Sequence, residues 1–280
     1  MTRQQALSQG REIFQANNIE DAFLESEILL RHVLELNRAQ FYLDIEDALS
    51  QEQAEAYWHL IERRRGGEPT AYITGHREFY GREFYVDTRV LIPRPESELL
   101  VEKALCLARK KPIATVADIG TGCGAIAVSL ALNLAPAKVY ATDVSGDALE
   151  VAGINGQRHG VADKICLRRG DLLEPLPEPV DLIIANLPYV QESTVLEDSS
   201  LSFEPSLALD GGPAGVEIIR RLCRQVSGKL NPGGCLLLEI GQGQRAAVSR
   251  FLGEFLPDGE IEIDKDLGGI ERVVSLCLTS

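Results

Sequence analysis

The sequence lacks the grouped cysteines and histidines that a zinc site or a disulfide framework requires. None of its six cysteines forms a Cys-x-x-Cys pair, and its four histidines lie far apart. We therefore expect no metal, and free buried thiols in a reducing cytoplasm. No apolar run reaches membrane-spanning length, and the N-terminus has no apolar signal segment. These absences predict a soluble, cytoplasmic protein without a membrane partner.

Positive charge is also scarce. The chain of 280 residues has 28 Lys and Arg against 42 Asp and Glu, a formal net charge of −14. Nucleic-acid-binding proteins usually carry a basic face that displaces counterions from phosphates, so no direct nucleic-acid partner is expected. The densest basic run, Arg63-Arg64-Arg65, is interpreted as the last turn of a helix, where cations complement the macrodipole.

Residues 1–75 show helical periodicity only, which predicts a small helical bundle. A capping box, in which two residues three apart cap the first turn of a helix reciprocally, is predicted at Thr2 with Gln5 and at Ser50 with Gln53. Asp21 is expected to cap a helix between these two, and Gly66-Gly67 to end the third helix. The bundle carries no chemistry of its own, so it either packs against the rest of the chain or grips a partner protein.

The pattern changes at residue 76. Aromatic and β-branched residues around Gly81 predict a β-hairpin within a linker, residues 76–95. Residues 96–280 alternate between apolar runs and helical stretches, which predicts an α/β domain: a mostly parallel sheet with helices on both faces. The expected strands contain residues 116–119, 139–142, 165–167, 182–185, 236–240, 261–263 and 273–278.

The first of these strands runs into a glycine-rich loop. The loop has three alternating glycines, at which a ligand can approach the backbone closely. A plain strand-to-helix turn needs only one glycine. The three glycines therefore predict a ligand loop, whose members are Gly120, Thr121, Gly122, Cys123 and Gly124. The pattern also satisfies the dinucleotide fingerprint if Ala125 takes the last place. However, the Asp118 carboxylate beside the loop would repel a pyrophosphate and favour a cation such as S-adenosylmethionine. Asp118 has an alternative role as a cap for nearby backbone N–H groups.

Two further acidic positions follow in the expected order. Asp143 ends the second strand about 20 residues past the loop, where nucleoside-binding α/β folds hold ribose hydroxyls. After the third strand, Asp171 is placed to accept the adenine amino group, with Leu172 packing on the ring. The alternative for Asp171 is a helix cap.

The fourth strand leads directly into Asn186-Leu187-Pro188-Tyr189. Ligands of open parallel sheets bind beyond the carboxyl ends of the strands, so this segment is expected beside the methyl group. An amide or ring-conjugated amino nitrogen is a poor nucleophile that must be held in line with a sulfonium. The Asn186 side-chain oxygen and the Pro188 carbonyl can accept its two N–H bonds, and Tyr189 offers a flat wall. This segment is the predicted catalytic and substrate-binding motif.

Together these motifs resemble the amino-methyltransferases with an Asn-Pro-Pro-Tyr motif. Further segments are similar to the bacterial family of peptide-chain-release-factor glutamine N5-methyltransferases, also called PrmC or HemK. They comprise residues 67–75, 78–81, 90–98, 204–212, 238–241 and 266–274. The resemblance covers nearly the whole chain. It departs at Leu187, which stands in place of the usual first proline, and at Leu172, where some relatives carry a larger aromatic residue.

The resemblance implies a class I S-adenosylmethionine-dependent methyltransferase fold with a seven-stranded sheet. It also implies N5-methylation of the glutamine in the Gly-Gly-Gln loop of class 1 release factors, which the N-terminal bundle would bind. Gly120 to Gly124, Asp143 and Leu172 would bind the cofactor, with Asn186 contacting both cofactor and substrate. Arg94 to Glu98 would lie at the rim of the active site without a catalytic step.

Several alternatives remain at this stage. A sister glutamine methyltransferase acting on a ribosomal protein typically has an Arg-Ser-Pro stretch where this chain has Arg94-Pro95-Glu96. An adenine-N6 nucleic-acid methyltransferase conflicts with the charge of −14. A non-catalytic S-adenosylmethionine sensor conflicts with the intact Asn186, Pro188 and Tyr189, and an NAD-dependent oxidoreductase lacks a proton donor near the loop.

Overall fold

The computed structural model describes residues 1–134, 137–197 and 201–279, with the backbone alone for residues 196 and 197. The chain divides into two compact units, Met1–His76 and Arg77–Ser280.

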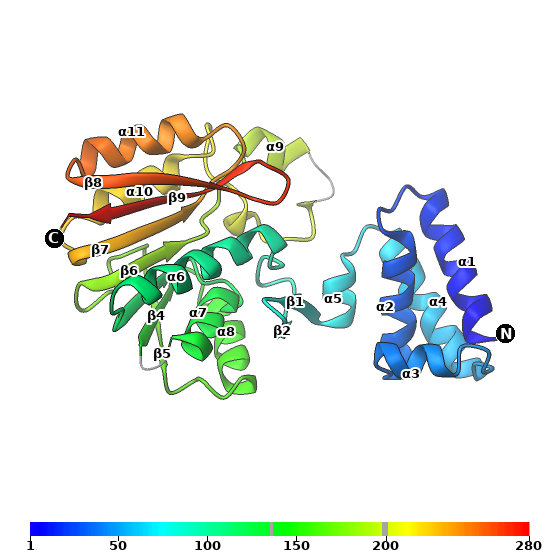
Figure 1. The fold of residues 1–280 in the computed structure, drawn as a ribbon. Coiled ribbons are helices and arrows are strands. Elements are labelled where there is room, and N and C mark those ends of the chain that lie inside the picture. Colours follow the sequence, from blue (N-terminus) through cyan, green and yellow to red (C-terminus); the bar gives the residue numbers. More distant parts are fainter. Residues whose placement is uncertain (135–136, 198–200, 280) are drawn as a thin grey trace. The chain divides into compact units, whose positions relative to one another are not determined.

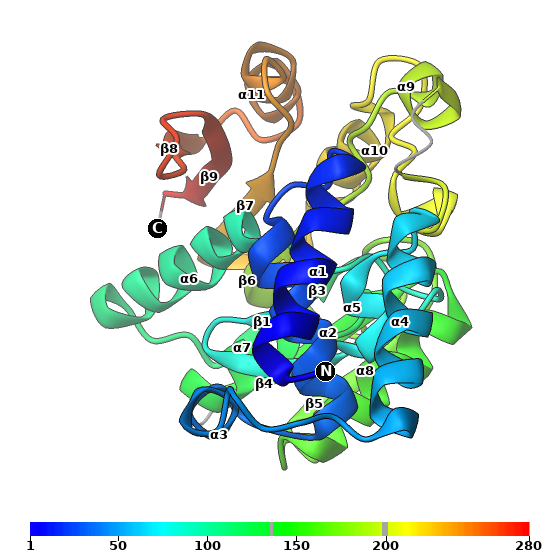
Figure 2. The ribbon, with the colours of Figure 1, turned by 90° about the vertical axis from the view of Figure 1, so that its right-hand side faces the viewer.

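The first unit is helical. Its elements are α1 (Arg3–Ala16), α2 (Ala22–Leu34), α3 (Arg38–Leu43), α4 (Gln51–Arg65) and α5 (Thr70–Thr74). Helices α1, α2 and α4 pack together (Figures 1 and 2). The large side chains in the core of this unit, including one from α3, are fully buried: Phe14, Leu29, Leu30, Phe41, Tyr57 and Ile61.

The predicted ends of these helices are largely confirmed. Thr2 and Ser50 each form a complete capping box, and Gly66 caps the C-terminus of α4. The prediction for Asp21 is wrong, because its backbone is left-handed (φ 51°) and its side chain accepts no capping hydrogen bond. The capping box of Asn37, which begins α3, was not predicted from the sequence.

The Arg63-Arg64-Arg65 run does form the last turn of α4. Each arginine pairs with a glutamate of the same unit: Arg63 with Glu68 at 2.5 Å, Arg64 with Glu25, and Arg65 with Glu62 at 2.5 Å. This basic run is therefore neutralised locally.

The predicted hairpin is confirmed as β1 (His76–Phe79) and β2 (Arg82–Tyr85), joined by a left-handed turn at Tyr80 and Gly81. The remaining elements form the α/β domain. They are η1 (Pro95–Ser97), α6 (Glu98–Lys110), β3 (Thr115–Ile119), α7 (Ala125–Asn133), β4 (Lys138–Asp143), α8 (Gly146–Arg158), β5 (Ile165–Arg169), β6 (Val180–Ala185), α9 (Glu192–Glu197), η3 (Ser206–Ala208), α10 (Glu217–Gln225), β7 (Leu230–Glu239), α11 (Arg245–Phe255), β8 (Gly259–Lys265) and β9 (Glu271–Leu278).

The main sheet has seven strands in the order β5-β4-β3-β6-β7-β9-β8, as the predicted fold class requires. The first five are parallel, and β9 runs antiparallel to both of its neighbours. Helices α6, α7 and α8 cover one face, and α10 and α11 cover the other (Figure 1). Alternate strand residues such as Ala117, Ile119 and Ile183 face the core beneath α10 and α11.

The strand order reverses at β3, which lies between β4 and β6. The last residues of β3 and β6, Ile119 and Ala185, are partners in the parallel register. The loops that follow these two strands therefore begin side by side, at the switch point where open α/β sheets bind ligands.

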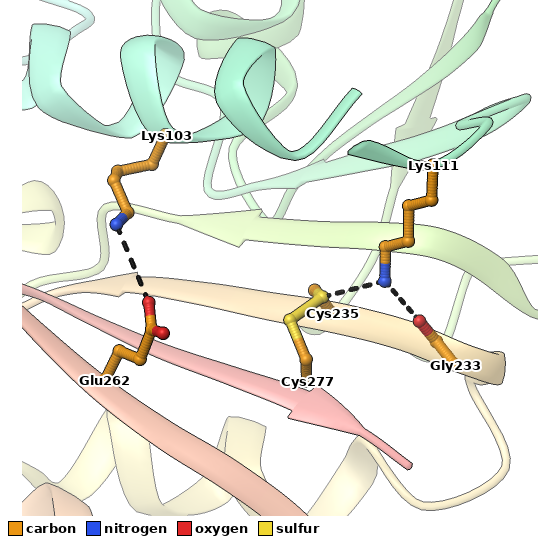
Figure 3. The surroundings of a disulfide bond; sticks show 6 residues. All are labelled: Lys103, Lys111, Gly233, Cys235, Glu262 and Cys277. Atoms are coloured by element: carbon orange, nitrogen blue, oxygen red, sulfur yellow. Dashed lines mark hydrogen bonds and ion pairs between the residues drawn. A yellow bond between two sulfur atoms is a disulfide. The ribbon is translucent and has the colours of Figure 1, made fainter. Parts of the chain in front are cut away.

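One prediction about the cysteines is wrong. Cys235 of β7 and Cys277 of β9 are partners in the antiparallel register and form a disulfide, with a Cα–Cα distance of 4.1 Å (Figure 3). The Lys111 ammonium lies 3.0 Å from the Cys235 sulfur. Cys106, Cys123, Cys166 and Cys223 are free. This pair could not be predicted from the sequence, because the two cysteines are 42 residues apart and meet only through strand pairing.

Candidate active site

The glycine loop joins β3 to α7 at the switch point. Gly120, Gly122 and Gly124 all have positive φ, between 55° and 81°. A Cβ at Gly120 would lie 3.0 Å from the Leu187 side chain, whereas a Cβ at Gly122 would meet nothing within 4 Å. Gly122 therefore borders open space, which leaves room for a ligand to approach the backbone.

Asp118 lies beneath this loop and is hydrogen-bonded to it. Its side chain is 1% exposed and accepts hydrogen bonds from the Thr121 hydroxyl at 2.6 Å and the Ala127 backbone N–H at 3.1 Å. Burial raises the pKa of Asp118 to about 7, against the opposing effect of these two hydrogen bonds. This geometry matches the capping role that we considered for Asp118, because the carboxylate satisfies donors of the loop and of α7.

Asp143 ends β4 beside the loop. Its carboxylate accepts the backbone N–H of Gly122 at 3.0 Å and that of Ser145 at 2.9 Å. Burial raises its pKa, and these backbone hydrogen bonds oppose the rise. Asp143 thus ties the glycine loop to the start of α8.

Asp171 and Leu172 follow β5. The Asp171 carboxylate accepts a hydrogen bond from the Arg221 guanidinium at 2.6 Å. Leu172 has a positive φ of 50°, and its carbonyl accepts the Thr142 hydroxyl at 3.0 Å. A branched side chain in this backbone region is uncommon and is maintained only by surrounding contacts.

The predicted acceptor motif follows β6. The Asn186 side-chain amide donates to the Ser97 hydroxyl at 2.8 Å. The Tyr189 carbonyl accepts the Gln244 amide at 2.9 Å, and the Tyr189 hydroxyl donates to Glu239 at 3.2 Å. Leu187 is 4% exposed and packs in the core. These hydrogen bonds and the burial of Leu187 therefore hold the turn in place.

A cavity of about 640 Å³ opens where these segments meet. Eight of the predicted site residues line it: Gly120, Gly122, Asp143, Asp171, Leu172, Asn186, Leu187 and Pro188. Five others lie outside its lining: Asp118, Thr121, Cys123, Gly124 and Tyr189. Tyr189 instead lines a neighbouring cavity of about 470 Å³.

Several residues that line the larger cavity were not predicted from the sequence, among them Arg89, Leu91, Ser145, Ala148, Leu207, Ile218 and Arg221. Ser145 carried a usable signal, because a serine just after a strand is a typical helix cap, and it does cap α8 through Ala148. Leu207 and Ile218 carried no signal, since they reach the cavity from segments far along the chain.

Within residues 1–134, 137–197 and 201–279, no group of three or more His, Cys, Asp or Glu side chains is arranged to hold a metal ion. Over the same residues, no helix is both long and apolar enough to span a membrane.

The sheet order and the switch-point cavity define a class I methyltransferase fold. The solved structure of a methyltransferase from Pyrococcus furiosus aligns with a TM-score of 0.52 at 17% identity, covering 72% of this chain and 91% of that one. A 16S rRNA methyltransferase from T. Thermophilus, in complex with AdoMet and guanosine, aligns with a TM-score of 0.53 at 18% identity, covering 72% and 49%. At these identities the likeness concerns the fold alone.

Sequence relatives define the family. Residues 5–75 match the family model "PrmC N-terminal domain", and residues 95–201 match "Methyltransferase small domain". A release factor glutamine methyltransferase of Moorella thermoacetica is 42% identical, covering 89% of this chain and 88% of that one. A relative with the same description from Koribacter versatilis is 39% identical, covering 98% of each. The chain belongs to the release factor glutamine methyltransferase family.

Proposed function

We propose that this protein transfers a methyl group from S-adenosylmethionine to the side-chain amide nitrogen of the glutamine in the Gly-Gly-Gln loop of class 1 release factors. Family membership supports the substrate, since close relatives carry that description. The observation that carries the proposal is structural. The pairing of Ile119 with Ala185 brings the glycine loop and the Asn186–Pro188 turn to one cavity.

The residues of the cavity fit this cofactor. Its volume of about 640 Å³ lies within the usual size of small-molecule sites. Gly122 borders open space, and Asp143 offers a carboxylate for ribose hydroxyls. Asp171 and Leu172 lie on the same lining and would contact the adenine. Asp118, which lies beneath the loop, would maintain the shape of the loop through its hydrogen bonds to Thr121 and Ala127, and would add a negative charge when it is ionised.

The chemistry assigned to Asn186 and Pro188 is positional. S-adenosylmethionine supplies a methyl carbon made electrophilic by its sulfonium. The Asn186 side-chain oxygen and the Pro188 carbonyl would each accept one N–H of the substrate amide, which turns the nitrogen lone pair toward the methyl. Positioning of this kind can lower a barrier by up to about 7–11 kcal/mol. No histidine lies among the described residues of the cavity lining, and this mechanism needs no general base before transfer.

The N-terminal unit would serve recognition. Residues 1–75 form the helical bundle that we propose to bind the release factor, and residues 76–95 form the linker. Its match to the "PrmC N-terminal domain" model supports this assignment. A substrate that acts in translation also supports a cytoplasmic location.

A label-transfer assay tests the proposal. The protein is incubated with methyl-labelled S-adenosylmethionine and, separately, with a class 1 release factor, a ribosomal-protein preparation and duplex DNA. We expect label in the release factor, lost when the loop glutamine is replaced by glutamate. Asn186→Ala should abolish transfer while cofactor binding persists. Label only in ribosomal protein would assign the enzyme to the sister activity, and label only in DNA would overturn the proposal.

A further inference from the structure

The Gln244 side chain joins three separate segments behind the turn that follows β6. Gln244 is the residue that precedes α11, and it is partly buried. Its Nε2 donates to the Tyr189 carbonyl at 2.9 Å and to the Gly215 carbonyl at 3.0 Å. Its Oε1 accepts the backbone N–H of Gly241 at 2.9 Å. One side chain therefore connects the turn after β6, the segment before α10 and the segment after β7.

The chemistry of the three partners sets the direction of this amide. A backbone carbonyl only accepts a hydrogen bond, and a backbone N–H only donates one. The NH₂ group of Gln244 must therefore face the Tyr189 and Gly215 carbonyls, and its oxygen must face Gly241. The opposite orientation would place an oxygen against two carbonyl oxygens and would lose all three hydrogen bonds. Only one orientation of the Gln244 amide is compatible with these partners.

Two buried glycines leave the room in which Gln244 and Tyr189 meet. A Cβ atom at Gly215 would lie 2.5 Å from the Tyr189 carbonyl oxygen and 2.9 Å from the Gln244 Nε2. A Cβ atom at Gly241 would lie 3.1 Å from the Gln244 Oε1 and 3.1 Å from Cδ2 of the Tyr189 ring. A side chain at Gly215 would therefore collide with the carbonyl that Gln244 holds, and one at Gly241 would crowd both the amide and the ring.

The hydrogen bond from Gln244 completes the restraint on the peptide that follows Tyr189. Its carbonyl accepts from Gln244, and its N–H, which belongs to Val190, donates to the Leu209 carbonyl at 3.0 Å. Both polar groups of this planar peptide are therefore bonded. The Pro188 carbonyl belongs to the peptide on the other side of Tyr189. Once the following peptide is fixed, the direction of the Pro188 carbonyl depends on the two backbone torsions of Tyr189.

We propose that Gln244 is a positioning residue for methyl transfer, which acts through Tyr189 to direct the Pro188 carbonyl and the Tyr189 ring toward the substrate amide. The inference rests on the proposed function insofar as the Pro188 carbonyl accepts an N–H of the substrate. Gln244 lines the smaller cavity and lies outside the lining of the larger one, where Pro188 and the residues proposed to bind the cofactor lie. A change at Gln244 should therefore affect the transfer step without affecting cofactor binding.

Steady-state kinetics with the release factor as substrate test the proposal. Gln244→Glu keeps the size of the side chain and an acceptor for Gly241, but it places a carboxylate without a proton against two carbonyl oxygens. We expect kcat to fall about 10- to 100-fold, since a misplacement near 1 Å can cost about 100-fold. The KM for the release factor and the affinity for S-adenosylmethionine should stay within about twofold, because the lost interaction belongs to the transition state. Gln157→Glu, the same change at an exposed position of α8 outside both cavity linings, is the control.

A neutral variant guards against an effect of charge on folding. Gln244→Met has nearly the same length and removes the donors and the acceptor together, so kcat should fall about 10-fold with the same unchanged cofactor affinity. If Gln244→Glu does not fold, Gln244→Met alone decides. An unchanged kcat in the folded variants would overturn the proposal. A loss of cofactor affinity as large as the loss in kcat would also overturn it, because it would show a general disruption of the domain.

Amide hydrogen exchange, followed by NMR, does not depend on the substrate. In Gln244→Met the Gly241 amide loses its acceptor, and the Val190 amide belongs to the peptide whose carbonyl loses its donor. We expect both amides to exchange about 10-fold faster than in the wild-type protein. A wild-type rate at Val190 would refute the restraint on the turn. If the wild-type protein transferred no methyl to the release factor, the proposed function would fail, and the exchange rates would still decide whether Gln244 restrains the turn.

Discussion

A Cβ atom at Gly211 would lie 2.7 Å from the carbonyl oxygen of Pro188. The same atom would lie 2.8 Å from the Gly215 carbonyl oxygen and 2.8 Å from the Tyr189 Cα. All of these atoms belong to backbone, so none can move aside by changing a rotamer. The Gly211 N–H also donates to the Val190 carbonyl at 2.8 Å. Gly211 thus allows two backbone segments to meet behind the acceptor motif.

Gly211→Ala should displace the Pro188 carbonyl and lower kcat for methyl transfer by about 100-fold, the effect expected of a misplacement near 1 Å. Cofactor affinity should change little, because Gly211 does not line the larger cavity. Steady-state kinetics and calorimetric titration with S-adenosylmethionine measure the two effects. Gly253→Ala is the control, since a Cβ there meets nothing within 4 Å. Equal kinetics in both variants would contradict this role of Gly211.

Asp143→Ala should weaken S-adenosylmethionine binding by about 10- to 100-fold, the equivalent of one charge-assisted hydrogen bond. Isothermal titration calorimetry gives the dissociation constant. The variant also loses the hydrogen bonds to the Gly122 and Ser145 backbone, so its thermal unfolding is compared in parallel. Ser145→Ala serves as the comparison for stability alone, because it removes the cap of α8 at Ala148 but also alters the lining of the cavity. An unchanged dissociation constant in Asp143→Ala would remove Asp143 from the site.

Asp118 should make the stability of the fold depend on pH. Its folded pKa, about 7, exceeds the usual carboxyl value of 3.8, so the folded state holds a proton that the unfolded state releases in between. The contribution of Asp118 to stability is therefore full below about pH 4 and is lost as pH rises through about 7. Asp118→Asn keeps an oxygen for Thr121 and Ala127 and should flatten this decline. Urea unfolding across that range provides the measurement, and parallel curves for both proteins would contradict the prediction.

The Cys235–Cys277 disulfide should stabilise the fold under oxidising conditions. Closing a loop between cysteines 42 residues apart restricts the unfolded chain, which the loop-entropy model values at about 4 kcal/mol. Cys277→Ser should therefore unfold at a lower temperature than the wild-type protein without reductant, and at nearly the same temperature with it. Cys106→Ser, at an exposed free cysteine, is the control. A difference between wild type and Cys277→Ser that persists in reductant would show that the bond is not its cause.

Local patterns predicted much of this fold from the sequence. The capping boxes at Thr2 and Ser50 fixed two helix starts, and apolar runs located all seven strands of the main sheet. The Asp21 prediction failed because capping requires an extended backbone at that position, whereas the chain adopts a left-handed turn there. Helices α3 and α5 were missed because helices of six and five residues show too little periodicity.

The candidate site likewise contains residues that could be predicted from the sequence and residues that could not. Residues next to strand ends, such as Gly122, Asp143 and Asn186, were predictable because the parallel sheet brings those ends together. Ser97 and Glu239 were not, since each meets Asn186 or Tyr189 across more than 45 positions of sequence. The role of Tyr189 was predicted only in part. The sequence predicts a wall for the substrate, and the structure adds a hydrogen bond to Glu239 and a position on the smaller cavity.

The most direct test is a crystal structure of the protein with S-adenosylhomocysteine and a peptide that contains Gly-Gly-Gln. We expect the Asn186 side-chain oxygen and the Pro188 carbonyl oxygen each within about 2.7–3.2 Å of the glutamine amide nitrogen, the range of a normal hydrogen bond. The cofactor sulfur should lie on the far side of the missing methyl group. A bound glutamine whose amide nitrogen contacts neither oxygen would contradict the account.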